Sequence, residues 1–218
     1  MDKGKQLIHQ WVWLLLPAFC LLGLFFPAIG MIAIGCMIAP IIMAFFKGRR
    51  WCGVYCPRGS FNDIILSKIS MKRRAPALLR KSWFKLFFLI LLMGAFGFQL
   101  IMARENINNI GEVFVRMVII TTLFTIALGI IYNQRTWCLI CPMGTMAHYV
   151  AKTKTIENRI EHVTFDKDKC IHCKVCSRNC PIAIDVYGHW KAGKVIDANC
   201  IKCMTCVGKC PKKSLYVA

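Results

Sequence analysis

Four long apolar runs dominate the pattern of hydrophobic and polar positions along the chain. Each run is about 20 residues long, so as an α-helix it would span about 30 Å, the thickness of the hydrocarbon layer of a membrane. The pattern therefore predicts four transmembrane helices, at residues 7–26, 28–46, 83–102 and 113–132.

The first two runs are separated by little more than Pro27. This spacing favours a tight hairpin of two spans, with a single bent or re-entrant segment as the alternative. Because the first run continues into the second without a small-residue cleavage site, we expect no cleaved signal peptide.

A different pattern follows the last apolar run. Residues 151–161, "AKTKTIENRIE", form a polar linker or a short helix in this interpretation. Beyond them, "HVTF" (162–165) and "SLYV" (214–217) are alternating or β-branched runs that could pair as strands, and two more such runs lie around Gly188 and Gly193. The predicted parts are a transmembrane domain at 1–150, a linker at 151–161 and a small α+β domain at 162–218.

A cysteine phrase follows each pair of apolar runs. "RRWCGVYCPRGSF" occupies residues 49–61 and "QRTWCLICPMGTM" residues 134–146. Both contain an Arg, Trp-Cys, Cys-Pro, Gly and then Ser or Thr, with three residues between the cysteines in the first phrase and two in the second. The order of hairpin, phrase, hairpin and phrase indicates an internal duplication. The predicted fold is an all-α four-helix transmembrane domain of two duplicated hairpins, followed by an α+β ferredoxin-like domain.

Local features of the phrases suggest how they meet the membrane. Trp51 and Trp137 suit the membrane–water interface. Ser60, followed three residues later by Asp63, resembles a capping box that opens a helix lying on the membrane surface.

Composition sharpens this picture. The 218 residues are 57% hydrophobic and include 14 cysteines, which together with the four apolar runs argues against an ordinary soluble enzyme and a disulfide-stapled secreted domain. Residues 47–85 hold eleven Lys or Arg and one acid, so by the positive-inside rule this loop faces the cytoplasm, together with both termini, both phrases and the C-terminal domain. We therefore expect a multi-pass protein of the cytoplasmic (inner) membrane, with its thiols in a reducing compartment where they bind metal.

The net charge of +19 does not require a nucleic-acid partner. Most of the excess Lys and Arg residues lie next to membrane exits, where they fix the orientation of the spans and meet anionic lipid. No nucleic-acid-binding module is visible. Membrane lipid is therefore an expected partner and nucleic acid is not. Arg116, just inside the fourth run, should extend outward with Glu112 one turn away as its partner; a place beside a quinone is the alternative.

The strongest chemical signal is a doubled motif near the C-terminus. "CIHCKVCSRNCP" and "CIKCMTCVGKCP" are two copies of C-x2-C-x2-C-x3-C-P, in which three closely spaced thiolates bind one [4Fe-4S] cluster and the fourth serves the other cluster. A zinc site is the alternative, but eight cysteines in this doubled pattern favour two clusters. Cluster one is assigned Cys170, Cys173, Cys176 and Cys210; cluster two is assigned Cys200, Cys203, Cys206 and Cys180.

The two phrases supply four more thiols on one side of the membrane. Brought together by helix packing, Cys52, Cys56, Cys138 and Cys141 would form a complete ligand set for a third [4Fe-4S] cluster. A redox-active dithiol or transient metal site, and merely structural thiols, are the alternatives. No C-x-x-C-H phrase is present to attach haem.

Taken together, these features resemble the membrane ferredoxin family that includes the NapH-type quinol dehydrogenase component of periplasmic nitrate reduction and the carboxy-terminal part of the nitrous-oxide-reduction protein NosR. The resemblance rests on the four runs, the WC-x3-CP-x-G and WC-x2-CP-x-G phrases and the doubled cysteine tail, and it covers nearly the whole chain.

The resemblance implies an integral membrane subunit that passes electrons between the quinone pool and a partner oxidoreductase, with a quinone as a further cofactor. No acid–base or nucleophile constellation indicates substrate chemistry of its own, so we expect an electron-transfer subunit of the quinol dehydrogenase type within an oxidoreductase complex. The alternative is an assembly factor that supplies electrons or metal to a maturing metalloenzyme. A redox sensor would need an output module, and the sequence shows none.

Overall fold

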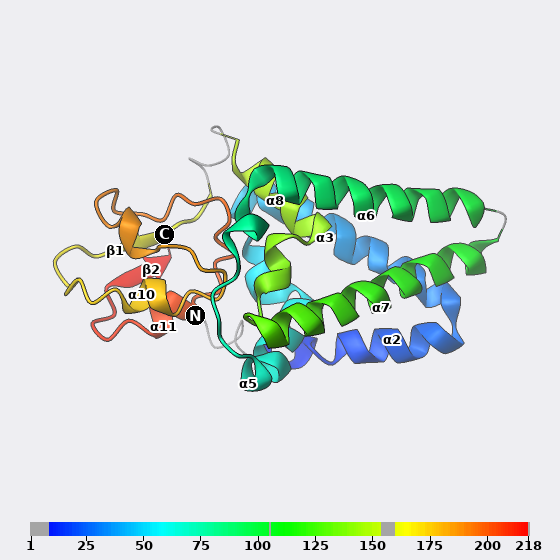
Figure 1. The fold of residues 1–218 in the computed structure, drawn as a ribbon, viewed down its shortest axis with the longest axis horizontal. Coiled ribbons are helices and arrows are strands. Elements are labelled where there is room, and N and C mark those ends of the chain that lie inside the picture. Colours follow the sequence, from blue (N-terminus) through cyan, green and yellow to red (C-terminus); the bar gives the residue numbers. More distant parts are fainter. Residues whose placement is uncertain (1–8, 105, 154–159, 218) are drawn as a thin grey trace.

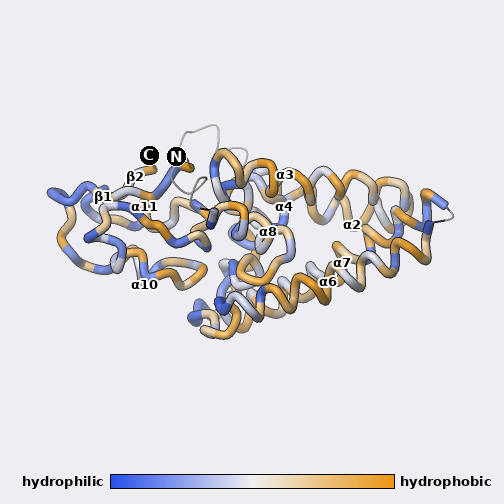
Figure 2. Tube along the Cα trace, turned by 90° about the horizontal axis from the view of Figure 1, so that it is seen from above, coloured by the Kyte–Doolittle hydropathy of each residue, from blue (hydrophilic) through white to orange (hydrophobic). Residues whose placement is uncertain are grey.

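An elongated bundle of apolar helices with a small cysteine-rich head at one end forms the molecule (Figure 1). The structure is a computed structural model that describes residues 9–104, 106–153 and 160–217. Figure 2 shows hydrophobic residues along most of the bundle and hydrophilic residues gathered in the head and in the loop at the opposite end. The long elements are α2 (Leu15–Phe25), the 3-10 helix η1 (Pro27–Ile32) running into α3 (Ala33–Lys47), α6 (Ser82–Met102) and α7 (Ile107–Ile131).

Three helical segments are long and apolar enough to cross a membrane, namely Pro27–Lys47, Ser82–Met102 and Ile107–Ile131. They correspond to the second, third and fourth apolar runs of the sequence. The first run is helical over His9–Phe25, a shorter apolar helix, and its first two predicted residues lie outside the described part of the chain.

The turn between α2 and α3 rests directly on the start of α7. A Cβ atom added to Gly30 would overlap the carbonyl oxygen of Gly111, and one added to Gly111 would overlap the carbonyl oxygen of Pro27. The two backbones touch because neither glycine has a side chain, which is the small-residue packing that membrane helices use.

Each cysteine phrase folds into short helical turns at the head end of the bundle. In the first phrase, a π-helical turn η2 (Trp51–Tyr55) leads into α4 (Pro57–Phe61), a second π-helical turn η3 (Asn62–Leu66) and α5 (Ser67–Ile69). In the second, a 3-10 turn η5 (Thr136–Leu139) leads into α8 (Pro142–Ala151). Both α4 and α8 begin with the proline of Cys-Pro, a residue that suits the first helical position because its missing N–H would be unpaired there. A further 3-10 turn, η4 (Ala77–Arg80), precedes α6.

Two local predictions about the phrases are wrong. Ser60 does not cap a helix: α4 begins after Cys56, and the Ser60 hydroxyl is hydrogen-bonded to the Nδ1 atom of His9 at 2.9 Å. Trp137 does not lie at an interface with lipid headgroups, because it is only 2% exposed and packs into the core beneath the head. The predicted pairing of Arg116 with Glu112 is confirmed, at 2.5 Å between exposed side chains.

The head contains the predicted strand pair. β1 (Val163–Phe165) pairs antiparallel with β2 (Leu215–Val217), as the alternation of residues indicates. The strands predicted around Gly188 and Gly193 are wrong: in the described residues this stretch has a 3-10 turn, η6 (Tyr187–His189), and one isolated bridge to Thr164. The β-branched residues there fill the core of the head instead of forming a ladder. Two short helices complete it, α10 (Val175–Arg178) and α11 (Thr205–Gly208).

Most of the predicted linker, at residues 154–159, lies outside the described residues.

Candidate metal centres

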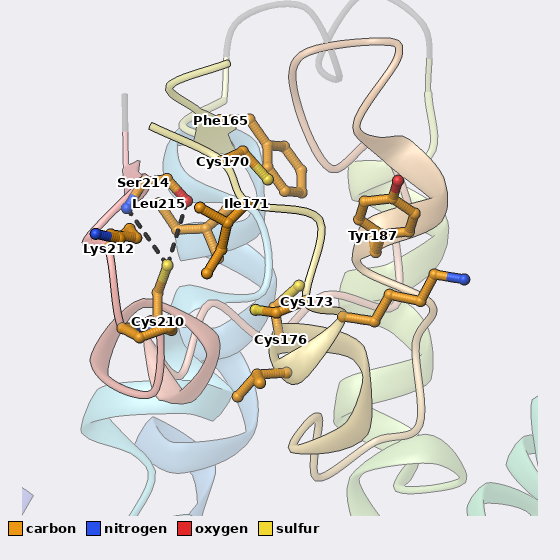
Figure 3. A pocket seen from close by; sticks show the side chains of 13 residues that line it. Phe165, Cys170, Ile171, Cys173, Cys176, Tyr187, Cys210, Lys212, Ser214 and Leu215 are labelled. Atoms are coloured by element: carbon orange, nitrogen blue, oxygen red, sulfur yellow. Dashed lines mark hydrogen bonds between the residues drawn. The ribbon is translucent and has the colours of Figure 1, made fainter. Parts of the chain in front are cut away.

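The first set of cysteines in the head surrounds one cavity. Figure 3 shows that thiols from the β1–α10 loop, from α10 and from the segment before β2 line the same space. Phe165 and Leu215 close its apolar wall, and the backbone N–H of Ser214 donates to the sulfur of Cys210 at 3.4 Å. This N–H donor suits a thiolate ligand. The cysteines that line the cavity are Cys170, Cys173, Cys176 and Cys210.

The cysteines of the second set also lie near one another. Burial raises the pKa of Cys200 to about 12, and negative charge on Cys203 or Cys180 would raise it further. Burial also raises the pKa of Cys206, which lies close to Cys203, Cys200 and Cys180 and also to Cys176 of the first set. The two sets therefore adjoin each other.

The backbone bends in the same unusual way around both sets. Non-glycine residues with positive φ flank the second cysteine of each motif and recur three residues after the fourth cysteine. Left-handed conformations are uncommon outside glycine, and their repetition indicates that each motif wraps around a common centre. They are His172, Lys174 and Ala183 in the first copy, and Lys202, Met204 and Lys213 in the second.

The shielding of the two sets is unequal. Ile201, in the second motif, is buried at 1% exposure, whereas its counterpart Ile171, in the first motif, is 54% exposed. The second set therefore lies deep, towards the helical bundle, and the first set lies close to solvent.

A third set of thiols comes from the two phrases at the end of the bundle. Burial raises the pKa of Cys52 to about 12; the guanidinium of Arg49 offsets part of this shift, and charge on Cys56, Cys138 or Cys141 would add to it. Burial likewise raises the pKa of Cys56 to about 11, with Cys138 and Cys141 again among its charged neighbours. The structure thus brings together four cysteines that are up to 89 positions apart in the sequence.

Two buried arginines join the phrases crosswise. Arg49, three residues before Cys52, donates from Nη2 to the carbonyl oxygen of Cys138 at 2.5 Å. Arg135, three residues before Cys138, donates from Nη1 to the carbonyl oxygen of Cys52 at 2.5 Å. Each phrase therefore supplies the cation that holds the other phrase.

Glycines make room for both arginines. A Cβ atom on Gly59 would collide with Nη1 of Arg135, and one on Gly144 would lie 2.7 Å from Nη2 of Arg49. Gly59 and Gly144 each lie three residues after the second cysteine of their phrase. Each phrase therefore has a glycine at the point where the guanidinium of the other phrase approaches its backbone.

The two arginines differ in their partners. Arg135 forms a two-pronged ion pair with Asp63, from Nε at 2.8 Å and from Nη2 at 2.6 Å. Burial alone would raise the pKa of Asp63, but Arg135 and His9 bring it down to about 2. At the position of Asp63 in the second phrase stands His148; burial and the cations Lys85 and Arg49 lower its pKa to about 4, so it is neutral at pH 7.

The head lies directly on the first phrase. A Cβ atom on Gly53 would overlap the carbonyl oxygen of Ile201, two residues before Cys203. Arg49 donates to the carbonyl oxygen of Asn199 at 3.3 Å, and the ammonium of the buried Lys202 donates to the carbonyl oxygen of Lys47 at 3.0 Å. The second set of cysteines therefore adjoins the third set, and the three sets form a series from the bundle outward.

The donor chemistry of these sites fits iron–sulfur clusters better than single ions. Within the described ranges, no three His, Cys, Asp or Glu side chains converge closely enough to hold one metal ion. A cube of iron and sulfide offers a separate iron corner to each of four thiolates, so its ligands stand farther apart than those of a single ion. The structure thus brings the twelve cysteines of the motifs and phrases together in three groups.

Sequence reasoning did not identify the basic residues that hold the phrases and the head together. The crossed arginines and Lys202 carry no motif of their own. The one available signal was that Arg49 and Arg135 occupy the same position in both phrases.

Comparison with known proteins agrees with these sites. Residues 29–76 and 115–159, which include both phrases, match a family model described as a 4Fe-4S binding domain. Residues 162–211 match one described as a 4Fe-4S dicluster domain. These matches show that the chain is an iron–sulfur protein with ferredoxin-type [4Fe-4S] domains.

Three distant relatives are also similar. The uncharacterized protein MJ0749 of Methanocaldococcus jannaschii is 26% identical over 186 residues, covering 82% of this chain and 68% of that protein. The uncharacterized protein MJ0750 of the same organism is 21% identical over 235 residues, covering 99% and 93%. YccM of Escherichia coli K12, whose name provisionally assigns it to electron transport, is 23% identical over 207 residues, covering 86% of this chain and 56% of YccM. No solved structure matches the chain.

The contact between head and bundle can be tested at Gly53. Gly53→Ala would push the backbone at Ile201 off the first phrase, so the amides of residues 199–203 should exchange with deuterium faster in detergent solution. Gly208→Ala, where no atom lies within 4 Å of the added methyl group, is the matched control and should leave these amides unchanged. Equal exchange in both variants would contradict the direct contact.

Proposed function

We propose that this chain is an integral membrane electron-transfer protein that passes electrons between the quinone pool and a partner oxidoreductase. The observation that carries the proposal is the series of three four-cysteine sets, each adjoining the next, from the helical bundle to the exposed end of the head. The relative YccM, named for electron transport, supports the same role.

The two sets in the head are the ligands of two [4Fe-4S] clusters in this proposal. Cluster one takes the four thiols around the cavity, and cluster two takes the adjoining buried set. Their fourth ligands are crossed: Cys210 lines the cavity with the first motif, and Cys180 lies beside Cys200 and Cys203. When bound, such clusters accept and release single electrons, while the protein supplies burial, hydrogen bonds and position.

Buried positive charge supports a third cluster at Cys52, Cys56, Cys138 and Cys141. Arg49 and Lys85 are 2% and 1% exposed, and neither forms a salt bridge with a carboxylate of the described residues, although Asp197 is a charged neighbour of Lys85. A buried cation without a counter-ion is costly by several kcal/mol. Four thiolates around a cluster would supply the missing negative charge, and a bound metal would deprotonate thiols whose pKa burial has raised.

The membrane arrangement in this proposal is four spans in two duplicated hairpins, over residues 1–150, with residues 151–161 linking them to the head at 162–218. The support is the crossed packing of the phrases: α8, from the second half of the chain, packs against α3 of the first half, and η3, from the first half, packs against α7 of the second half. The lysines and arginines of residues 47–85 favour the cytoplasm for the head end.

Arg58 marks where a quinone could meet this path. It follows Cys56 by two residues and reaches into the bundle, where Nη2 donates to Thr121 Oγ1 of α7 at 2.8 Å. Thr121 lies ten residues, or about 15 Å, from the end of α7 at Ile131, so the guanidinium lies about halfway through a hydrocarbon layer. Its buried Nε has no hydrogen-bond partner among the described residues.

A cation at such depth is costly, and it marks a functional site more often than a structural one. The oxygen of a quinol headgroup would accept the unused Nε–H donor. The equivalent position in the second phrase is Met143, so the donor exists on one side of the bundle only.

Iron content tests the number of clusters. We expect about 12 irons per chain in anaerobically purified protein, and about 8 in Cys52→Ala or Cys138→Ala. Cys36→Ala, which removes a thiol of α3 outside all three sets, is the matched control and should keep about 12. About 8 irons in every variant and in the parent protein would contradict the third cluster.

Quinol-driven reduction tests the role of Arg58. Arg58→Met, which copies the second phrase, should slow the reduction of the clusters by duroquinol about tenfold or more, the worth of one charge-assisted hydrogen bond. Reduction by dithionite and the iron content should not change. Arg116→Met is the matched control, because that arginine pairs with Glu112 on the exposed surface. An unchanged duroquinol rate in Arg58→Met would contradict a quinone site at this residue.

A further inference from the structure

Arg49 and Arg135 occupy matching positions in the two phrases, but only the charge of Arg135 is balanced by a carboxylate. Arg135 is fully buried, and the carboxylate of Asp63 accepts two of its N–H donors, so the pair as a whole is close to neutral. Arg49 is equally buried but has no carboxylate partner in the described part of the chain, and its Nε makes no hydrogen bond there.

The second phrase cannot neutralise Arg49 as the first phrase neutralises Arg135. The position that corresponds to Asp63 holds His148, whose Nδ1 is also buried without a partner among the described residues. Lys85, a further cation in this region, donates to the side-chain oxygen of Asn199 and adds no negative charge. Arg49 therefore contributes a whole positive charge beside Cys52 and Cys138.

Adding an electron to a buried cluster adds one negative charge in a region of low dielectric constant. A nearby uncompensated cation stabilises the reduced form and so raises the reduction potential. A cation whose charge is balanced by an adjacent carboxylate has a much smaller effect.

We propose that Arg49 raises the reduction potential of the membrane-face cluster, and that Asp63 holds it down by cancelling the charge of Arg135. The proposal rests on the third cluster of the proposed function. Both residues are positioning and charge-setting groups, and neither is a ligand. The two phrases thus place their arginines in the same way, but one has Asp63 where the other has His148. Because of this difference, positive charge acts on the cluster mainly from the side of Arg49.

The test is a redox titration followed by electron paramagnetic resonance, on full-length protein whose iron content has been measured first. Arg49→Gln keeps an N–H donor for the carbonyl of Cys138 but removes the charge, so the midpoint potential of one cluster should fall while those of the two head clusters stay constant. Arg49→Lys keeps the charge and should return that midpoint toward the parent value. Asp63→Asn should shift the same midpoint upward.

Arg50→Gln is the matched control, because Arg50 is the neighbouring residue and is already paired with Glu161. It should shift the midpoint much less than Arg49→Gln does. If Arg49→Gln lost the third cluster, two other shifts would still decide the question. Asp63→Asn should raise the midpoint in the parent protein, and it should also raise the midpoint when added to Arg49→Lys.

Three results would overturn the proposal: unchanged midpoints in Arg49→Gln at full iron content, a midpoint in Arg49→Lys as low as in Arg49→Gln, or no upward shift in Asp63→Asn. About 8 irons in the parent protein would instead overturn the third cluster itself. The iron count therefore separates failure of the proposed function from failure of this inference.

Discussion

Buried positive charge organises the junction between the helical bundle and the head. Arg49 and Arg135 lie under the two cysteine phrases, and Lys202 lies between Cys200 and Cys203 of the second motif, all at 5% exposure or less. Charges this deep are stable only beside compensating negative charge or strong hydrogen bonds. Their donors reach backbone carbonyls of the phrases and the head, and the sulfur atoms beside them are the natural source of negative charge.

This constraint explains why the three parts of the chain meet where they do. The arginines tie the phrases to each other, and Arg49 also donates to the carbonyl oxygen of Asn199, just before the first cysteine of the second motif. Gly53 lets the head approach until backbone touches backbone. A path for electrons needs its centres close together and shielded from water, and the same contacts that bury the charges provide both conditions. The exposed Ile171 leaves the first set of cysteines, at the far end of the series, close to solvent.

The sequence predicted which cysteines lie together better than it predicted their surroundings. Cysteine spacing is local, so the doubled motif and the repeated phrases indicated which thiols belong together, and the alternation at both ends of the head predicted β1 and β2. The crossing of Arg49 and Arg135 depends on how distant helices pack, which no local pattern encodes. The same limit explains three local errors. Ser60 and Asp63 have the spacing of a capping box but bind His9 and Arg135 instead. Trp137 is covered by the head, and the β-branched residues between Ile184 and Val195 fill its core.

The most direct test of the account is to locate iron in crystals of the anaerobically purified protein by anomalous diffraction at the iron absorption edge. The account predicts three separate iron peaks in series, one of them enclosed by Cys52, Cys56, Cys138 and Cys141 and adjoining the buried cluster of the head. Two peaks, both within the head, would contradict it.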